Sequence, residues 1–409
     1  MNMPAWVVET WNRMNAAFPW IQARRGKTEL ESSPLSECNP PLLITAEDLE
    51  LYYYSSDCPF PEQKQLHLYQ TSGTSSGRRK RIYYSDADEA AYLSIKEEVF
   101  RAVLQGKGLR SALSDMGTGH AEATALAVFK GLGLEADSIS FRLPVERHLE
   151  KLSAMKPEVL YTMPSILDRI LGASDDPGSY GIRQVILVGE IASPGWIRRT
   201  AQQLRIPVDR ITDTYGSIEV GTIAYYSYDY GRYIVTDGLW AEGVGTEELG
   251  EDLEPLPEGE QVLVLTSSVR EAFPAVRYVT YDVVRDLRPI MVDGRLRQSF
   301  KSLVRRIGPD LKHGEKISIY DIENVVYAYA GKAGLAVEVA GNALRLHIDS
   351  DELSPALMEE IRREVEGRIP ELGQMIRSGI LGGIEVLHGK GPGGASNHSA
   401  VKSKRIWYS

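Results

Sequence analysis

The sequence predicts an α/β protein: a large N-terminal domain of βαβ-type parallel sheets plus a β-rich subdomain, then a small α+β C-terminal domain. Helical and strand patterns alternate between residues 121 and 214, as in parallel βαβ units. From residue 233, short apolar runs between Gly-, Pro- and Glu-rich turns indicate antiparallel strands. A polar, charged segment at 305–314 precedes further helix and strand patterns, so we place the domains at 1–304 and 305–409, joined by a hinge.

Hydrophobic spacing predicts the individual elements. In the large domain, helices are expected at 5–20, from 45, at 87–104, 121–132, 165–171 and 194–204. Its strands are expected at 66–70, 82–84, 159–161, 184–188, 210–214, 233–236, 261–266 and 276–278. In the small domain we expect helices at 322–330 and 355–369 and strands at 335–339, 343–348 and 383–386. Thr45 with Asp48 resembles a capping box, and Ser85 or Asp86 can cap the long helix that follows.

The composition argues against several classes of protein. The 409 residues carry a formal net charge of −10, whereas nucleic-acid binders usually show a basic excess or stripe, so we expect no nucleic-acid partner. Cys38 and Cys58 form no CxxC pattern, which disfavours structural zinc; we expect free thiols, with one disulfide as the alternative. The first residues do not resemble a signal peptide, and no run of about 18 uncharged apolar residues occurs. We therefore expect a cytoplasmic protein with no membrane partner.

The segment between the strands at 66–70 and 82–84 has the composition of a phosphate-binding loop. Two glycines allow the backbone N–H groups to turn toward one anion, five hydroxyls can donate to phosphate oxygens, and Lys80 adds positive charge. The segment lacks the order of a nucleotide P-loop, and a polar surface turn is the alternative. Its residues are Thr71, Ser72, Gly73, Thr74, Ser75, Ser76 and Gly77.

Three further segments follow predicted strands, where open α/β sheets bind their ligands. In the first, residues 213–221, Tyr215 offers a flat face for a base and Glu219 an oxygen for Mg²⁺. The second ends in Gly189-Glu190, and in the third, residues 277–282, Asp282 can accept two sugar hydroxyls. Taken singly, Glu219 is better explained as a solvated carboxylate and Asp282 as a turn residue.

In this order, together with residues 42–49 and 161–167, the segments resemble the adenylate-forming superfamily of acyl-CoA synthetases and adenylation domains. The likeness is greatest to its phenylacetate–CoA ligase-like branch. It implies that the glycine segment with Lys80 holds the triphosphate of ATP, that Glu219 holds Mg²⁺ and that Asp282 binds the ribose. Tyr215 would stack on adenine. The resemblance also assigns nucleotide contacts to Gly189, Glu190, Asp213, Thr214, Gly216 and Ser217.

The C-terminal part of the resemblance is looser. Residues 310–318 resemble the superfamily's hinge, with Asp310 as its pivot and Arg306 reaching phosphate or ribose just before it. Residues 399–405 resemble the closing loop whose lysine reaches the α-phosphate and carboxylate during adenylation. We place that lysine at Lys402, with Lys404 as the runner-up, and a solvated basic tail is the alternative explanation for either one.

Three positions depart from the superfamily's pattern. Arg79 stands where a proline is common, and Tyr281 replaces a usual glycine before the ribose-binding aspartate. Ile218 stands where a threonine usually touches the α-phosphate. Because an isoleucine cannot donate a hydrogen bond, that phosphate contact has to come from another residue or be lost.

The resemblance implies an acid–thiol ligase that forms AMP. A carboxylic acid, expected to be an aryl or small acyl acid, would displace pyrophosphate from ATP and give an acyl-adenylate, with Lys402, Glu219 and Lys80 as catalytic residues. The acyl group would then pass to coenzyme A after the small domain rotates about its hinge. The alternatives are a carrier-protein thiol, an amine, or a relative that binds adenylates without catalysis. Gly189 lies in the expected acid pocket, where we hypothesise that Met116 or His120 contacts the acid; a structural histidine is the alternative.

Overall fold

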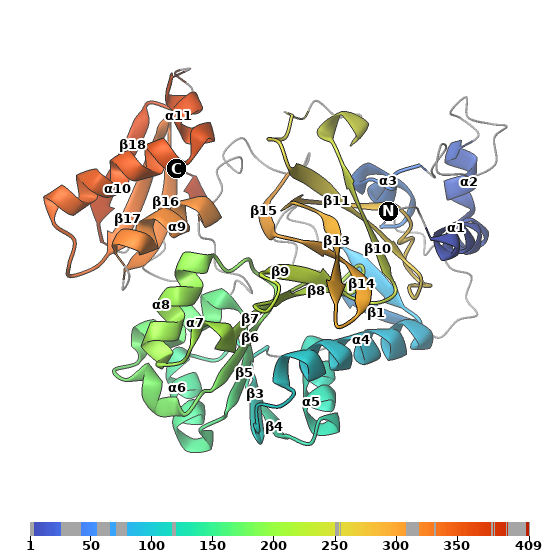
Figure 1. Ribbon diagram of the computed structural model, residues 1–409, viewed down its shortest axis with the longest axis horizontal. Helices are drawn as coiled ribbons and strands as arrows, with labels where there is room; N and C mark the ends of the chain where they lie inside the picture. The colour runs from blue at the N-terminus through green and yellow to red at the C-terminus, as the bar shows by residue number, and fades with distance from the viewer. Residues whose placement is uncertain are drawn as a thin grey trace. The chain divides into compact units, whose positions relative to one another are not determined.

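The computed structural model describes residues 4–25, 42–54, 66–70, 80–116, 120–249, 253, 255–307, 319–330, 333–377, 379, 381–389, 391 and 406–408. The chain divides into two compact units (Figure 1). The first unit comprises residues 1–106 and 214–310, and the second comprises residues 107–213 and 311–409. The domain boundary expected after residue 304 stays a prediction.

The first unit begins with helices and a hairpin: α1 (Ala5–Ala17), α2 (Pro19–Arg25), α3 (Ala46–Tyr52), β1 (His67–Gln70), β2 (Arg81–Tyr84) and α4 (Asp86–Leu104). The helix expected at 5–20 is divided at Phe18, because the residue before a proline is disfavoured in the helical conformation and Pro19 follows. Both expected caps are confirmed. Thr45 with Asp48 and Ser85 with Asp88 form complete capping boxes.

The rest of the first unit is β-rich, as expected. Its strands are the end of β7 (Ile211–Ser217), β8 (Gly221–Ser227), β9 (Arg232–Val235), β10 (Leu239–Val244), β11 (Glu260–Ser267), β12 (Tyr278–Arg285), β13 (Arg288–Val292), β14 (Arg295–Phe300) and β15 (Ser302–Arg306). One antiparallel sheet has the order β10-β11-β12-β15, and β7, β8, β9, β14 and β13 are antiparallel neighbours in another. The two sheets carry the residues of the candidate site.

The second unit contains the parallel sheet that the alternating pattern predicts. Its strands are β3 (Ser111–Ser114), β4 (Glu135–Ser138), β5 (Val159–Thr162), β6 (Gln184–Leu187) and the start of β7, and all of their pairings are parallel. The helices are α5 (His120–Gly131), α6 (Val145–Met155), α7 (Pro164–Ala173) and α8 (Pro194–Leu204). Helices α6, α7 and α8 lie on one face of the sheet and α5 on the other (Figure 1). The α/β class is confirmed.

The C-terminal stretch adds a small α+β module to the second unit. It comprises α9 (Ile319–Tyr329), β16 (Gly334–Ala340), β17 (Ala343–Asp349), α10 (Pro355–Arg368), α11 (Pro370–Arg377), β18 (Gly383–His388) and β19 (Ile406–Tyr408), with sheet order β18-β17-β16-β19. Helix α9 packs closely on α8 at Gly195, where a Cβ atom would lie 3.1 Å from the Glu323 carbonyl oxygen. The Gly195 N–H donates to Asn324 Oδ1 at 3.0 Å, so a glycine permits this close approach.

Among the helices in the described ranges, none combines the length and apolar character needed to cross a membrane.

Candidate active site

Glu219 lies in the turn that joins β7 to β8 in the first unit. A Cβ atom on Gly216 would lie 2.7 Å from the Gly221 carbonyl oxygen, so this tight turn requires glycine at 216. The Glu219 side chain is half-buried, and no described residue forms a hydrogen bond or ion pair with its carboxylate. A carboxylate in that state is chemically suited to Mg²⁺, which binds proteins through one or two carboxylates together with substrate phosphates.

Tyr215, Asp282 and Arg306 come together beside this turn. The Tyr215 hydroxyl donates to Asp282 Oδ2 at 2.6 Å, and Arg306 Nη1 lies 3.9 Å from Asp282 Oδ1. Asp282 on β12 and Arg306 on β15 are cross-strand partners, which explains their approach. Burial, and then the charge of Asp282, raise the pKa of Tyr215 well above its usual range, so its hydroxyl stays a donor. The three residues that the sequence proposed for nucleotide binding are therefore neighbours.

A bulge in β12 presents Asp282. The pairing of β11 with β12 shifts register between Val262 and Val264, next to Tyr281. Tyr281 has a φ of 61°, in the left-handed region that glycine adopts most easily, and this is the position where the superfamily usually has glycine. Its ring is buried and its hydroxyl accepts the Ala46 N–H at 3.4 Å. Packing of the side chain thus offsets the strain of the backbone.

Lys80 is the described end of the expected phosphate segment. Its Nζ lies 3.3 Å from Glu50 Oε1 and 5.0 Å from the centre of the Tyr54 ring. Only 17% of the Lys80 side chain is exposed, so the ammonium group is held in place rather than freely solvated. Sequence reasoning did not single out Tyr54, because residues 54 and 80 are brought together only by the fold.

Two tyrosines, Tyr54 and Tyr278, lie close enough to Glu219 for its charge to affect them. Burial, and then the negative charge of Glu219, raise the pKa values of Tyr54 and Tyr278 well above their usual range. Within the described ranges, neither hydroxyl has a hydrogen-bond partner. Both hydroxyls are therefore available to a ligand that approaches Glu219.

The other first-unit residues that the sequence singled out make contacts that support the shape of the turn. Thr214 is buried in β7, and the Ser217 hydroxyl accepts the Val220 N–H at 3.4 Å within the Glu219 turn. The Ile218 side chain offers no donor, but its carbonyl oxygen accepts the Tyr84 hydroxyl at 2.7 Å. These contacts hold the shape of the turn.

In the second unit, Gly189 and Glu190 follow β6 as expected. Gly189 has a φ of 82°, which favours glycine. The Glu190 carboxylate accepts both the Ser165 N–H and the Ser165 hydroxyl at 2.8 Å, and so it ties the β6 end to the start of α7. Asp213 is buried in β7, paired in register with Leu187.

Met116 follows β3 in the second unit and packs against its core. The preceding residue, Asp115, is buried with its Oδ2 3.1 Å from His148 Nδ1, while His148 Nε2 lies 3.3 Å from the Leu143 carbonyl oxygen. Burial raises the pKa of Asp115, and the hydrogen bond to His148 opposes that rise. This buried pair fixes the chain just before Met116. Position 120 begins α5.

Several expected site residues lie outside the described residues. They are the phosphate segment Thr71–Gly77, Asp310, Lys402, Lys404 and the side chain of His120.

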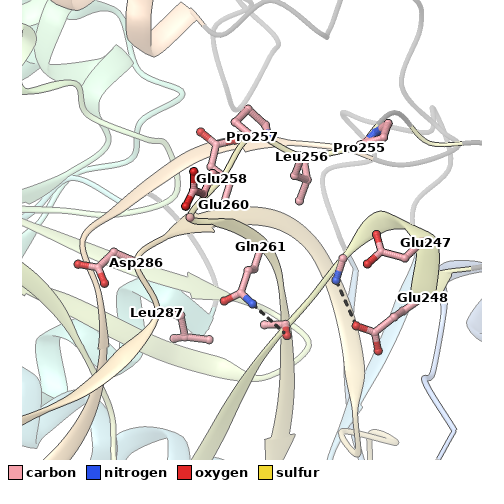
Figure 2. A pocket seen from close by; sticks show the side chains of 13 residues that line it. Glu247, Glu248, Pro255, Leu256, Pro257, Glu258, Glu260, Gln261, Asp286 and Leu287 are labelled. Carbon is pink, nitrogen blue, oxygen red and sulfur yellow. Dashed lines mark hydrogen bonds between the residues drawn. The ribbon is translucent and has the colours of Figure 1, made fainter.

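A pocket with an acidic lining lies elsewhere in the first unit (Figure 2). Glu247, Glu248 and Glu258 line it, together with Glu260, which pairs with Arg285 at 2.6 Å. Carboxylates repel phosphate, so this pocket is unsuited to the triphosphate.

Comparisons with known proteins identify relatives of this chain. The family described as "Fumarate--diaminopropanoate ligase C-terminal domain" matches residues 312–390. A relative from Enterobacter agglomerans, fumarate–(S)-2,3-diaminopropanoate ligase, is 35% identical over 396 residues, which cover 94% of each chain.

Solved structures give the fold. 2-Hydroxyisobutyryl-CoA ligase, in its postadenylation state with 2-HIB-AMP, has a TM-score of 0.70 and 17% identity over 100% of this chain and 91% of its own. Amide bond synthetase McbA from Marinactinospora thermotolerans has a TM-score of 0.50 and 15% identity over 90% of this chain and 75% of its own. The resemblance read from the sequence is confirmed: this chain is an adenylate-forming ligase and belongs to the family of fumarate–(S)-2,3-diaminopropanoate ligase.

Proposed function

We propose that this chain is an amide ligase that activates a small dicarboxylic acid with ATP and joins it to an amine. The observation that carries the proposal is the 35% identity, over 94% of both chains, to a ligase that joins fumarate to a diamino acid. Fumarate and (S)-2,3-diaminopropanoate are therefore the first acid and amine to test. Transfer to coenzyme A, our first expectation, stays a prediction that the comparisons favour less than the amine.

The reaction has two steps. A carboxylate oxygen of the acid attacks the α-phosphorus of ATP, and the bond to pyrophosphate breaks as the acyl-adenylate forms. The amine nitrogen then attacks the acyl carbon, AMP leaves, and the nitrogen loses a proton. Because both steps depend on orientation and on neutralised phosphate charge, no nucleophile from the protein is required.

The residues proposed to bind the nucleotide include the cluster of Tyr215, Asp282 and Arg306 in the first unit. Asp282 accepts from the ribose hydroxyls while Tyr215 holds its other oxygen at 2.6 Å. Lys80 and the Thr71–Gly77 segment hold the phosphates, and Arg306 adds a positive charge 3.9 Å from Asp282. The hydroxyls of Tyr54 and Tyr278, which are unused within the described residues, would replace the donor that Ile218 lacks.

Glu219 is the residue that would hold Mg²⁺. Its carboxylate has no competing ion pair among the described residues, and phosphate oxygens would complete the coordination. When bound, the metal neutralises phosphate charge. The protein's own part is to keep the Glu219 turn rigid through Gly216 and the contacts of its carbonyl oxygens.

Product analysis tests the function. The purified chain is given ATP, Mg²⁺ and fumarate, and then (S)-2,3-diaminopropanoate, coenzyme A or an acyl carrier protein in separate reactions whose products are identified by mass spectrometry. An amide with the amine, formed at a rate well above that of any thioester, supports the proposal. A thioester as the main product would contradict it and restore the first expectation.

The adenylation lysine is tested separately. Lys402→Ala should abolish fumarate-dependent exchange of pyrophosphate into ATP but spare amide formation from supplied fumaryl-adenylate, because Lys402 serves only the first step. Lys404→Ala is the matched control and should keep exchange. The reverse pattern would assign the role to Lys404.

A further inference from the structure

Arg270 is a buried cation that sequence reasoning did not single out. It follows β11 in the first unit and is 2% exposed. We propose that Arg270 is a positioning residue that sets the spacing between β2, the strand that follows Lys80, and the Glu219 turn, and thereby the affinity for MgATP. This inference rests on the nucleotide-binding part of the proposed function.

The guanidinium group bridges two backbone segments. Its Nε donates to the Glu219 carbonyl oxygen at 2.9 Å, and its Nη2 donates to the Tyr83 carbonyl oxygen at 3.1 Å. Tyr83 lies on β2, three residues beyond Lys80, so one planar group binds the carbonyl of the proposed metal-site residue and the strand that directly follows the phosphate-site lysine. A rigid fork of donors fixes both the distance and the angle between its two acceptors.

Asp88 and Tyr84 hold the guanidinium in this orientation. Its Nη1 pairs with the buried carboxylate of Asp88, and its carbon lies 3.8 Å from the centre of the Tyr84 ring. Tyr84 in turn donates its hydroxyl to the Ile218 carbonyl oxygen at 2.7 Å. The carbonyls of two consecutive residues in the Glu219 turn, 218 and 219, are therefore both bound by this group of side chains.

Asp88 has a second set of contacts that makes the arrangement rigid. Its carboxylate accepts the Glu271 N–H at 2.7 Å and the Ala272 N–H at 3.0 Å, directly after Arg270. It also accepts the Ser85 N–H at 3.0 Å in the capping box of α4. We call Arg270, Tyr84 and Asp88 the turn clamp.

The contacts of Arg270 identify it as a positioning residue and not a catalytic one. Arg270 donates its hydrogen bonds to two protein carbonyls and forms an ion pair with Asp88, so it acts on ATP only through the placement of Glu219 and of the strand after Lys80. Lysine at this position would keep a positive charge beside Asp88, but one ammonium group cannot reproduce the planar fork. Arg270→Lys therefore removes the bridge without leaving the buried carboxylate unpaired.

Arg232 provides the matched control. It is also buried in the first unit, and it donates to Ser299 Oγ at 2.9 Å and to Asp286 Oδ2 at 2.7 Å. Its hydrogen bonds among the described residues are to Ser299 and Asp286, and none goes to the Glu219 turn or to β2. Arg232→Lys should cost a similar amount of thermal stability and leave nucleotide binding unchanged. Tyr84→Phe gives a milder test, because it removes only the hydroxyl bound to Ile218.

The experiment measures binding of a non-hydrolysable ATP analogue by calorimetry over a series of Mg²⁺ concentrations, with melting temperatures measured in parallel. Arg270→Lys should weaken MgATP binding by about 10–100-fold, as loss of a residue that orients a metal ligand typically does, and raise the Mg²⁺ concentration for half-saturation. Tyr84→Phe should change both quantities in the same direction by less.

Equal MgATP affinities for Arg270→Lys and Arg232→Lys would overturn the inference, as would a loss of affinity in Arg270→Lys that does not depend on Mg²⁺. The measurement requires neither the acid nor the amine, so a failure to find the amide product leaves its result standing. A wild-type chain that binds no MgATP would overturn both the nucleotide site and the role of Arg270.

Discussion

Replacing Tyr215 with phenylalanine separates the two roles that this ring can have. The ring would keep its edge-to-face contact with Phe300, whose centre lies 6.2 Å away, and would keep any face that it offers to adenine. The variant removes only the hydroxyl that donates to Asp282 at 2.6 Å. Without that donor, Asp282 is free to turn toward Arg306, which lies 3.9 Å away, and to withdraw an oxygen from the ribose.

The hydrogen bond sets the size of the effect. A hydrogen bond to a charged group contributes about 1.5–3 kcal/mol, which corresponds to about 10–150-fold in affinity. We expect the Kd for ATP to rise within that range, while the Kd for 2′,3′-dideoxy-ATP changes little, because that analogue has no ribose hydroxyls for Asp282. Since the pKa of Tyr215 is raised well above its usual range, the wild-type preference for ATP over the dideoxy analogue should stay constant up to pH 10.

Calorimetric titration with the two nucleotides checks this expectation. Tyr226→Phe is the control, since Tyr226 lies on neighbouring β8 and packs on Tyr233 rather than on the cluster. If Tyr215→Phe retains the wild-type discrimination between ATP and its dideoxy analogue, the hydroxyl does not orient Asp282 for ribose, and the reasoning fails.

Three further changes test burial, strain and the missing phosphate donor. Burial lowers the pKa of Lys96 from 10.5 to about 7. Between these two pH values the unfolded chain therefore holds a proton on Lys96 that the folded chain has lost. The free energy of unfolding of the wild type should rise with pH across that window, by at most about 5 kcal/mol. Lys96→Met should flatten this slope in urea unfolding at pH 6, 8 and 10 and be the more stable chain at pH 6; an unchanged slope would contradict the burial argument. Tyr281→Gly should relieve about 1 kcal/mol of backbone strain but lose about 3–5 kcal/mol of side-chain packing. Urea unfolding should therefore show a less stable chain. A more stable chain would show that the packing of Tyr281 does not outweigh the strain. Tyr54→Phe should lower kcat/KM for ATP in pyrophosphate exchange about five- to tenfold with an unchanged melting temperature, as expected for the loss of one hydrogen bond; full activity would remove Tyr54 from the phosphate site.

The sequence predicted those features that depend on local pattern. The alternation between residues 121 and 214 correctly gave a parallel sheet, since each βαβ unit repeats its own hydrophobic period. Both capping boxes were also predictable, because the side chain and the N–H group that it accepts are three residues apart. The hairpin of β13 and β14 was missed. Its outward residues Met291 and Leu296 are exposed, so the strands lack the alternation that marks a half-buried strand.

The candidate site was predictable only where one short segment carries its signal. Tyr215 and Glu219 share a segment, and Asp282 ends another, so their resemblance to a family could be recognised. Arg270 belongs to no such pattern. Its role depends on carbonyls at 83 and 219, and backbone carbonyls have no sequence signature.

The state of each tyrosine hydroxyl distinguishes supporting residues from candidate ligand contacts. Tyr53 donates to the Ala272 carbonyl oxygen, Tyr84 to that of Ile218, and Tyr215 to Asp282, so these three hydroxyls stabilise the protein. The hydroxyls of Tyr54 and Tyr278, by contrast, have no hydrogen-bond partner within the described ranges. A hydroxyl that forms no hydrogen bond within the protein can donate to a ligand without first breaking one. Both of these hydroxyls lie within reach of the charge of Glu219, and a triphosphate bound there would supply the acceptors.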